Sequence, residues 1–476
     1  APYRLFAYQL ETVKWMQMRE ATALQHPDVT TTGTGCLLAM TMGLGKTVCV
    51  GNVIAASLEE QRRQTSCSLY ICPKSLLRTV QGEFTKFFGS GVRTRIFHRD
   101  FMRSAYDSFV LPVDVDVLIT SYHTAVVQHT TWFGRFPWFR VILDESHEIR
   151  NPHSQRYQAL QSLHSPRKVC MSGTPIHNHI GDLFTQLEFC NLRIHATVPR
   201  TAAALCSSGV MAMIKFVDHD DALEAVQLPP LRSSCLAIHF TPTEQAVHDA
   251  YVHSSRQLLL ATDLDQVRGN LLRAMQACTS TTLVPLGTPH TAGISSKVAR
   301  FLTLVKELLG QGSKILIFAN FTSSLQYAQE ALARDMGVTT QSFTRLVHGR
   351  LPSAQREHLL EEFRVCPNVR LLFMTLKLGS VGLNLVEANS VVFLEPWYSF
   401  AAMSQGIGRC HRIGQLSPVQ VYYLLVHGSV EDTVYHTALQ KKALASEVVS
   451  YVDLLLDRDE LIQCVDDNKP EEVRLT

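Results

Sequence analysis

The sequence predicts an α/β protein with two lobes, each built on a mostly parallel sheet that is flanked by helices. The chain has 476 residues, which is too long for one ordinary hydrophobic core and fits two domains with connecting material. Twice along the chain, short apolar runs alternate with helix-length stretches, as expected for strands joined by helical crossovers. The runs are almost continuously apolar, which indicates strands buried on both faces.

Five apolar runs predict the strands of a first lobe, placed at residues 1–192. They are Cys36–Met40, Cys67–Cys72, Val115–Thr120, Phe139–Asp144 and Arg167–Met171. Five more runs predict a second lobe at residues 296–450: Lys314–Ala319, Thr344–His348, Val369–Thr375, Ser390–Glu395 and Val419–Val426. Residues 193–295 lose the alternation and are predicted to form a helical bridging or inserted region. Residues 451–476 are predicted to form a C-terminal tail.

Composition limits the class of protein. Hydrophobic residues make up 46% and charged residues 18%, as in a folded protein, and 44 Lys and Arg against 42 Asp and Glu give a charge of +2. This balance excludes a strongly cationic coat, so any nucleic-acid site should be a local groove. No apolar run approaches the roughly 20 residues of a membrane helix. Twelve cysteines without Cys-x-x-Cys pairs indicate reduced, intracellular thiols and no zinc site.

A glycine loop follows the first predicted strand and precedes a helix-like segment. In this context Met40–Thr47, MTMGLGKT, has the pattern of a phosphate-binding loop, in which glycines let backbone amides curl around phosphate. Lys46 would reach the outer phosphates and the Thr47 hydroxyl could ligate magnesium. The alternative is a glycine turn before an ordinary helix. The predicted nucleotide-binding residues of the loop are Met42, Gly43, Leu44, Gly45, Lys46, Thr47 and Val48.

Two carboxylates end a later buried strand, in the segment Val141–Pro152. Asp144 would hold magnesium through its water shell and Glu145 would orient the attacking water. Such a pair alone is often a helix cap or a solvated turn, but its place downstream of the glycine loop favours nucleotide chemistry. Ser172 and Thr174 follow the next strand and could pass on the nucleotide state, although an isolated Ser-Gly-Thr-Pro string is a common turn.

An arginine motif, Gln405–Gln415, lies in the second predicted lobe. Arg409 and Arg412 are three residues apart, so on a helix they would project from one face and could point across a cleft at a γ-phosphate. Arginines supplied by a facing lobe stabilise transition-state charge. For any lone pair of arginines, the alternative is a surface salt bridge.

Taken in order, these blocks resemble the SWI/SNF-type family of DNA-dependent ATPases in helicase superfamily two. The resemblance covers nearly the whole chain, and its most specific part is the HRIGQ string behind QxxGR. Other matching segments are Leu5–Met16, Ile71–Leu77, Ile119–Ala125, Thr375–Leu385 and Phe393–Ser399. The DESHEIRNP box looks closest to the branch with post-replication-repair and transcription-termination translocases. The implied fold is two RecA-like lobes.

The resemblance also implies roles for single residues. Gln9 would read the adenine, Asp144 and Glu145 would serve magnesium and water, and Arg409 and Arg412 would act as arginine fingers. Coupling of nucleotide state to DNA would involve Ser172, Thr174, Gly382 and Gln405. Trp397 and the segments Ile71–Leu77 and Ile119–Ala125 are candidate DNA-facing elements, although a Trp after a buried strand is more often a core residue.

The implied activity is ATP hydrolysis with Mg²⁺ in the cleft between the lobes, coupled to translocation on double-stranded DNA. Family members step along one strand without separating the duplex, and many move nucleosomes or displace bound proteins. We therefore expect a monomeric motor that acts in the nucleus. A strand-separating helicase of the DEAH type, acting on RNA or DNA, and a weakly hydrolysing ATP-bound scaffold are the alternatives. The HRIGQ string argues against the first of them.

The chain departs from the family pattern at three places. Met40 and Thr41 stand where the family has Asp-Glu, Ser380 replaces a Gly, and Ile214–Asp221 replaces a basic Arg-Arg-Thr-Lys segment. None of these changes removes a magnesium ligand, the base or a finger, so they concern coupling more than hydrolysis. Within the motif-like strings, His147, His348 and His411 are interpreted as structural or surface residues, not metal ligands.

Overall fold

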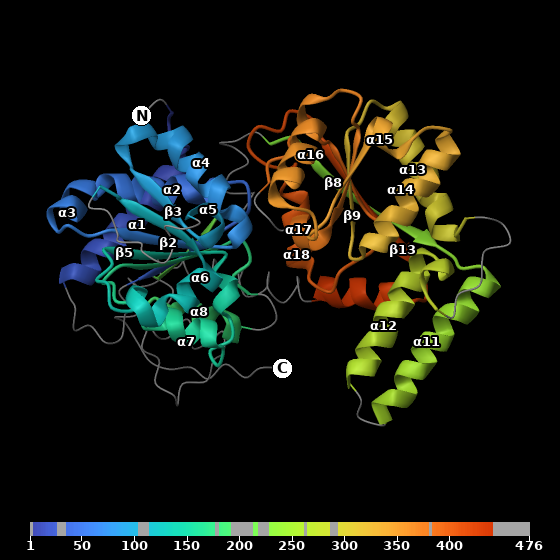
Figure 1. Ribbon diagram of the computed structural model, residues 1–476, viewed down its shortest axis with the longest axis horizontal. Helices are drawn as coiled ribbons and strands as arrows, with labels where there is room; N and C mark the ends of the chain where they lie inside the picture. The colour runs from blue at the N-terminus through green and yellow to red at the C-terminus, as the bar shows by residue number, and fades with distance from the viewer. Residues whose placement is uncertain are drawn as a thin grey trace, which may run out of the picture. The chain divides into compact units, whose positions relative to one another are not determined.

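The computed structural model describes residues 3–25, 35–102, 114–176, 180–191, 213–217, 228–260, 264–285, 294–379 and 383–440 (Figure 1). The main boundary between two compact units falls between residues 222 and 223, and we call the parts on its two sides the first and the second lobe. Each lobe has a parallel sheet with helices on its two faces (Figure 1), so the predicted fold class is confirmed. Gly382, Ser380 and the tail at residues 451–476 lie outside the described residues.

Seven strands form the sheet of the first lobe, in the order β3-β4-β2-β5-β6-β1-β7, and every neighbouring pair is parallel. The strands are β1 (Cys36–Met40), β2 (Ser68–Cys72), β3 (Thr94–Phe97), β4 (Val117–Ser121), β5 (Arg140–Asp144), β6 (Lys168–Ser172) and β7 (Ile214–Val217). All residues of β1, β2, β4, β5 and β6 are buried, because helices cover both faces of this sheet.

Helices of the first lobe pack in two layers. The helices are α1 (Ala7–Gln25), α2 (Lys46–Ala56), α3 (Leu58–Arg63), α4 (Leu77–Phe88), α5 (Arg99–Met102), α6 (Tyr122–Val127), α7 (Gln155–Gln161) and α8 (Gly181–Phe189), with short turns at Lys74–Leu76, Gly89–Gly91, His129–Phe133 and Ser146–Ile149. One face of the sheet packs with α6 and α8 in a core that contains Trp138 and Phe184. On the other side α2 contacts both α1 and α4. The carboxyl ends of the strands, where ligands bind in such sheets, are thereby framed by helix termini.

Six strands form the sheet of the second lobe, in the order β10-β11-β9-β12-β13-β8, again all parallel. They are β8 (Leu231–Ile238), β9 (Ile315–Ala319), β10 (Thr344–Val347), β11 (Leu371–Thr375), β12 (Ser390–Phe393) and β13 (Val419–Val426). Phe301 and Leu325 belong to the core on one face of this sheet, and Phe363 and Met403 to the core on the other.

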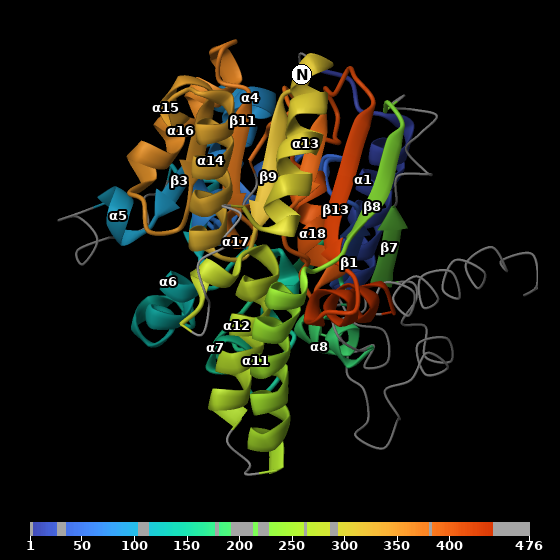
Figure 2. The ribbon, with the colours of Figure 1, turned by 90° about the vertical axis from the view of Figure 1, so that its right-hand side faces the viewer.

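The helices of the second lobe include a long hairpin. They are α11 (Pro242–Leu260), α12 (Leu264–Thr279), α13 (Ser296–Gly310), α14 (Thr322–Met336), α15 (Thr340–Phe343), α16 (Ser353–Val365), α17 (Leu376–Gly379) and α18 (Phe400–Ile407), with a short turn at Thr281–Leu283 and a further helix at residues 430–440. Figure 2 shows α11 and α12 lying side by side and projecting away from the sheet. The hairpin thus extends the second lobe beyond its sheet.

All ten predicted strands are present, with ends within two residues of the expected ones. The prediction that residues 193–295 are helical is wrong in part, because this region supplies β7 to the first sheet and β8 to the second. Both are edge strands, and β8 is mostly exposed, so neither needed the apolar run that marks a central strand. Thr41, directly after β1, donates its backbone N–H to the Val217 carbonyl at 2.8 Å. The segment Ile214–Asp221 therefore begins as a strand beside β1.

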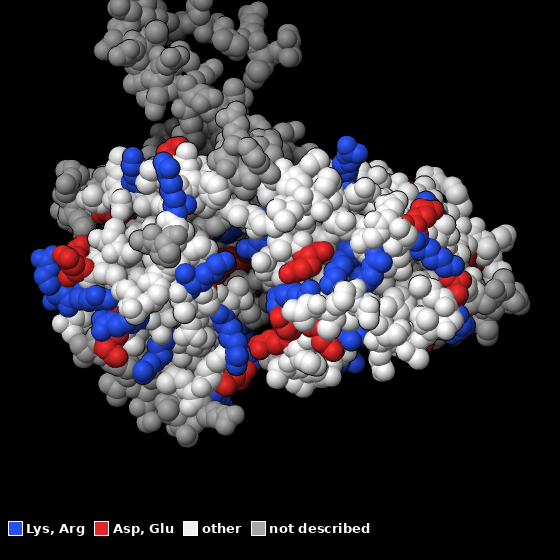
Figure 3. Space-filling model, turned by 90° about the horizontal axis from the view of Figure 1, so that it is seen from above, with Lys and Arg blue, Asp and Glu red and all other residues white. Residues whose placement is uncertain are grey.

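The surface carries mixed charge. In Figure 3, Lys and Arg side chains on the face shown are interspersed with Asp and Glu and form no continuous basic coat. This agrees with the formal charge of +2 and leaves local grooves as the places to seek a nucleic-acid site. No helix in the described part of the chain is long and apolar enough to cross a membrane.

Candidate active site

The glycine loop turns directly from β1 into α2. Gly43 and Gly45 have φ angles of 86° and 91°, in the left-handed region that glycine adopts at little cost. Gly45 caps the N-terminus of α2, so the first N–H groups of that helix face the loop. The Lys46 Nζ donates to the Met40 carbonyl at 2.8 Å, which holds the ammonium group over the loop. This cradle of backbone donors with one lysine suits a polyphosphate.

Gln9 lies against the same loop. It is buried near the start of α1, its Oε1 accepts from the Phe6 N–H at 3.2 Å, and its Nε2 donates to the Tyr8 hydroxyl at 3.3 Å. A Cβ atom on Gly45 would lie only 2.6 Å from the Gln9 Nε2. The structure therefore brings together two groups that the sequence analysis assigned to one nucleotide.

Asp144 ends β5 and is held by two buried tyrosines. The Tyr70 hydroxyl donates to its Oδ2 at 2.9 Å and the Glu145 backbone N–H donates to its Oδ1 at 2.9 Å. The Tyr122 hydroxyl donates to the Asp144 backbone carbonyl at 2.8 Å. Burial, then the neighbouring Glu145 carboxylate, raises the pKa of Asp144 to about 6, while Lys46 and the Tyr70 hydrogen bond act in the opposite direction. Neither tyrosine's contact with Asp144 was predicted from the sequence.

Glu145 adopts a left-handed backbone conformation, with φ 52° and ψ 51°, which is uncommon for a residue with a side chain. Its Oε2 lies 3.5 Å from the His147 Nδ1. Burial, followed by the charge of Arg150, lowers the pKa of His147 to about 4, so the imidazole is neutral near pH 7. The contact with Glu145 is therefore a polar contact with a neutral ring and not an ion pair.

His147 also connects the carboxylates with the next strand. Its Nδ1 lies 3.4 Å from the Ser172 Oγ, and that oxygen accepts from the Thr174 N–H at 3.0 Å. The His147 ring thus lies between Glu145 and Ser172, whereas the sequence had indicated a structural or surface residue at this position. The signal that could have found it is its place two residues after Glu145, within the carboxylate box itself.

The chemistry of the donors fits a magnesium nucleotide. Asp144 offers a carboxylate and Thr47, in the first turn of α2, offers a hydroxyl, and Mg²⁺ prefers such hard oxygen ligands. Of the other predicted loop residues, Leu44 and Val48 are buried and Met42 is half-buried. The apolar side chains therefore anchor the loop, which leaves the backbone and Lys46 as the candidate groups for binding phosphates.

The prediction that Arg409 and Arg412 share a helix face is wrong. Helix α18 ends at Ile407, and both arginines lie in the turns that follow it. Gly408 caps α18, and Gly414 further along has a φ of 103°, in the left-handed region that favours glycine. Arg409 is buried and Arg412 is half-buried, so both remain candidate fingers on a fixed turn.

Gln415 and His411 hold this turn. The Gln415 Nε2 donates to the carbonyls of Val386, Ala388 and Cys410 at 3.0, 2.8 and 3.1 Å. The His411 ring contacts the Pro229 carbonyl at 2.9 Å. The most family-specific string of the sequence is thus largely structural, because its histidine and glutamine fix the backbone around the two arginines.

Two further candidates lie in the second lobe. Gln405 is buried on α18. Trp397 is half-buried against the sheet core and stacks on Tyr398 with ring centroids 4.0 Å apart, which favours the core interpretation over a DNA-facing one. Gly382, the remaining coupling candidate, lies outside the described residues.

A polar hollow opens at the carboxyl ends of β2, β3 and β4 in the first lobe. Its cavity volume is about 590 Å³, and its walls are Pro73, Lys74, His98, Arg99, Asp100, Ser121, Tyr122, His123, Thr124, Val127, Glu148 and Arg156. The hollow unites the segments Ile71–Leu77 and Ile119–Ala125, which the sequence analysis named as DNA-facing candidates. Tyr122 connects it to the carboxylate box, because its hydroxyl donates to the Asp144 carbonyl.

Fold and candidate site together fit an ATPase with two parallel-sheet lobes. The SNF2-related domain matches residues 8–201 and the helicase conserved C-terminal domain matches residues 297–414. The chain belongs to the SWI/SNF-type family of DNA-dependent ATPases within helicase superfamily two.

Relatives of different lengths share this similarity. The probable global transactivator of Orgyia pseudotsugata multicapsid polyhedrosis virus is 27% identical over 96% of this chain and 92% of its own length. The mouse SWI/SNF-related matrix-associated actin-dependent regulator of chromatin subfamily A member 1 is 24% identical over 91% of this chain but 44% of its own. A solved Sulfolobus solfataricus SWI2/SNF2 ATPase core in complex with dsDNA is 23% identical, with a TM-score of 0.41 and coverage of 94% of this chain and 93% of that one.

Proposed function

We propose that this protein is an ATP-dependent translocase on double-stranded DNA that hydrolyses ATP with Mg²⁺. The observation that carries the proposal is the hydrogen bond from Tyr122, in the wall of the polar hollow, to Asp144 of the carboxylate box. If the carboxylate box shifts with the nucleotide state, this hydrogen bond would move Tyr122 and thereby the wall of the hollow. Hydrolysis and a change of grip on DNA can thereby be coupled inside one lobe.

In the proposed reaction, the loop amides and Lys46 hold the phosphates and Gln9 reads the base. Thr47 and Asp144 would hold a magnesium ion, which would neutralise charge on the phosphates when it is bound. Glu145 orients the attacking water, and the neutral imidazole of His147 keeps the Glu145 carboxylate in place without a compensating charge. Arg409 and Arg412 stabilise the developing negative charge during turnover. Ser172, Thr174, Gly382 and Gln405 relay the nucleotide state.

The polar hollow is the proposed phosphate-backbone contact. Lys74, Arg99 and Arg156 supply positive charge to it, against the carboxylates of Asp100 and Glu148. Contacts of this kind fix a protein on DNA without reading its sequence, which is what movement along arbitrary DNA requires. Because these three basic side chains lie in one hollow, a chain with a net charge of +2 can bind DNA without a generally basic surface.

The family supports a proposal about the cargo and the setting of this motor. We propose that the motor works as a monomer in the nucleus and moves nucleosomes or displaces DNA-bound proteins. The names of its relatives, a regulator of chromatin and a viral transactivator, support work on packaged or occupied DNA. Displacement of a nucleosome or of a bound repressor from a labelled duplex, with and without ATP, measures this activity.

The decisive experiment measures phosphate release with duplex DNA, single-stranded DNA, single-stranded RNA or no nucleic acid. We expect duplex DNA to give the largest stimulation, and Lys46→Ala and Glu145→Gln to abolish turnover while the fold survives. Lys86→Ala, on the exposed side of α4, is the control for loss of a lysine. Full turnover by both site variants would refute the proposed mechanism. Stronger stimulation by RNA would favour a strand-separating helicase, and ATP binding without hydrolysis would favour a scaffold.

A second arm tests the polar hollow. Lys74→Ala together with Arg99→Ala should raise the DNA concentration needed for half-maximal stimulation and leave the rate at saturating DNA unchanged. Each lost phosphate contact should lower the slope of log affinity against log salt by about 1. Unchanged DNA affinity and salt dependence would place the DNA elsewhere.

A further inference from the structure

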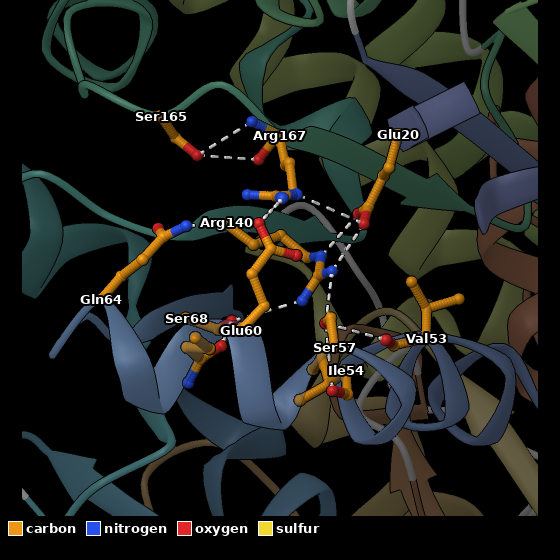
Figure 4. A network of polar contacts seen from close by, with 11 residues as sticks. Glu20, Val53, Ile54, Ser57, Glu60, Gln64, Ser68, Arg140, Ser165 and Arg167 are labelled. Atoms are coloured by element: carbon orange, nitrogen blue, oxygen red, sulfur yellow. Dashed lines mark hydrogen bonds and ion pairs between the residues drawn. The ribbon is translucent and has the colours of Figure 1, made fainter. Parts of the chain in front are cut away.

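A buried ion-pair network lies at the amino-terminal ends of the central strands in the first lobe (Figure 4). Its centre is Arg140, the first residue of β5, whose side chain is completely buried. The Arg140 Nε and Nη2 donate to Oε1 and Oε2 of Glu20, on α1, at 2.6 Å each. A two-pronged contact of this kind fixes the relative orientation of both groups as well as their distance.

The same guanidinium group contacts two more elements. Its Nη2 donates to the Ser57 Oγ at 3.1 Å, and Ser57 caps the end of α2 by donating to the Val53 and Ile54 carbonyls at 3.1 and 3.2 Å. Its Nη1 donates at 3.4 Å to the Oγ of Ser68, the first residue of β2. One side chain from β5 thereby contacts α1, α2 and β2.

Arg167 extends the network to β6. It directly precedes that strand, is 3% exposed, and its Nε lies 3.7 Å from the Glu20 Oε2. Its Nη2 donates to Glu60 at 2.7 Å, and its guanidinium lies 4.0 Å from the centre of the Phe139 ring. Glu20 is thus a carboxylate shared by two buried arginines, each at the start of a central strand.

Apart from α3, which supplies Glu60, each element in the network also carries part of the nucleotide site. Helix α1 carries Gln9 and α2 begins with Lys46, while β5 ends with Asp144 and β6 ends with Ser172. Strand β2 carries Tyr70, which donates to Asp144. Glu20 and Gln9 are eleven residues apart on α1, about 16 Å at 1.5 Å per residue. The network therefore joins the far ends of the elements that form the nucleotide site.

Stability is a weak reason for such a network. Burying charged groups has a desolvation cost that the ion pair often only offsets, and apolar replacements of a whole buried pair are frequently neutral or stabilising. What the two-pronged contact does supply is a unique arrangement of α1 and α2 against β5. Because α1 carries Gln9 and the phosphate loop leads into α2, this arrangement would set the distance between Gln9 and the loop.

We propose that Glu20 and Arg140, assisted by Arg167, are positioning residues for nucleotide binding. They act through α1 and α2 to set Gln9 against the glycine loop, and so control affinity for ATP and preference for adenine more than the chemical step. This role rests on the proposed nucleotide site.

The first test replaces the pair by apolar side chains of similar length, in the double variant Glu20→Leu with Arg140→Met. Arg167 keeps its Glu60 partner in this variant. We expect an unfolding midpoint close to that of the parent, an ATP KM and a dissociation constant for a fluorescent ATP analogue raised about tenfold, and kcat within about twofold. Preference for ATP over GTP should fall. Arg62→Met is the control for loss of an arginine ion pair elsewhere in the first lobe, since Arg62 pairs with Asp116 at 2.7 Å and Asp116 keeps Arg93 as a second partner.

The second test is a double-mutant cycle between Gln9→Ala and Glu20→Gln, read out as nucleotide affinity. Residues this far apart normally give additive effects. The positioning role requires coupling: Gln9→Ala should cost at least about threefold less affinity in the Glu20→Gln background, because Gln9 is already displaced there. Arg140→Lys, which keeps one charged contact, should recover part of the affinity.

The outcomes separate two failures. Normal hydrolysis by Lys46→Ala would overturn the proposed site and with it the positioning role. If Lys46→Ala is inactive while the Glu20 and Arg140 variants bind ATP like the parent, or the cycle is additive, only the positioning role is overturned. An affinity loss that merely follows a loss of stability would also overturn it.

Discussion

Replacing Tyr70 with Phe removes one hydroxyl group from the buried Asp144 carboxylate and leaves the ring in place. That hydroxyl donates to Oδ2 at 2.9 Å, and a hydrogen bond to a charged group is worth about 1.5–3 kcal/mol. Since one pKa unit corresponds to about 1.4 kcal/mol, the pKa of Asp144 should rise by about one to two units. It would move from about 6 to between about 7 and 8.

The sign of the effect on activity follows from the proposal that the ionised form of Asp144 holds magnesium. A higher pKa leaves less carboxylate at a given pH, so kcat/KM of the Tyr70→Phe variant at pH 7 should fall about two- to tenfold and recover by pH 9. The assay is duplex-stimulated phosphate release from pH 5.5 to 9, because kcat/KM reports ionisations of the free enzyme. The acid limb should move to higher pH by the same one to two units.

Tyr122→Phe is the matched control for this prediction. Tyr122 is also a buried tyrosine, and it donates to the backbone carbonyl of Asp144 instead of the carboxylate. Its loss should lower stability by about 1 kcal/mol and leave the acid limb in place. An unmoved acid limb in Tyr70→Phe, or the same shift in both variants, would refute the assignment of that limb to Asp144.

Two further changes test other parts of the molecule. Gly45→Ala places a Cβ 2.6 Å from the Gln9 Nε2 at a φ of 91°, so ATP affinity should fall at least about tenfold. Gly82→Ala on α4, where a Cβ meets nothing within 4 Å, should leave ATP affinity unchanged. Equal ATP affinities of the two variants would contradict this prediction. Lys297→Met leaves the fully buried Glu431 unpaired and should cost about 3–5 kcal/mol, most of it recovered by adding Glu431→Leu. Burial already raises the pKa of Glu431 from 4.5 to about 7, so the free energy of unfolding falls as pH rises through that range. The loss of stability in Lys297→Met should therefore be smaller at pH 5 than at pH 8. Urea denaturation, with hydrogen exchange in strands β9 to β13, measures this difference.

Central strands and the glycine loop could be predicted because their signals are local. Strand β1 is a continuous apolar run followed by two glycines, and both its ends match the predicted ones. Strand β8, LRSSCLAI, is polar and mostly exposed, so only its pairing with β13 makes it a strand. The turn that carries Arg409 was predicted as a helix because three-residue spacing outweighed the flanking glycines.

The contacts that arrange the site could not be predicted, since they join residues far apart in the sequence. Tyr70 and Asp144 are 74 residues apart, and Glu20 and Arg140 are 120 apart. Neither pair leaves a periodic pattern, because each depends on which strands become neighbours. Candidate residues for a nucleotide could therefore be named in advance from local motifs, whereas the residues that hold those candidates in place could not.

The strand pairing beside the glycine loop sets a lower limit on the length of a fragment that contains only the first lobe. Residues 37–40 of β1 pair in register with residues 214–217 of β7, so a fragment that ends at residue 192 would leave that strand with an open edge. Open apolar edges invite pairing with other chains. We expect a fragment that ends at residue 192 to self-associate, and a soluble nucleotide-binding fragment to extend at least to Val217.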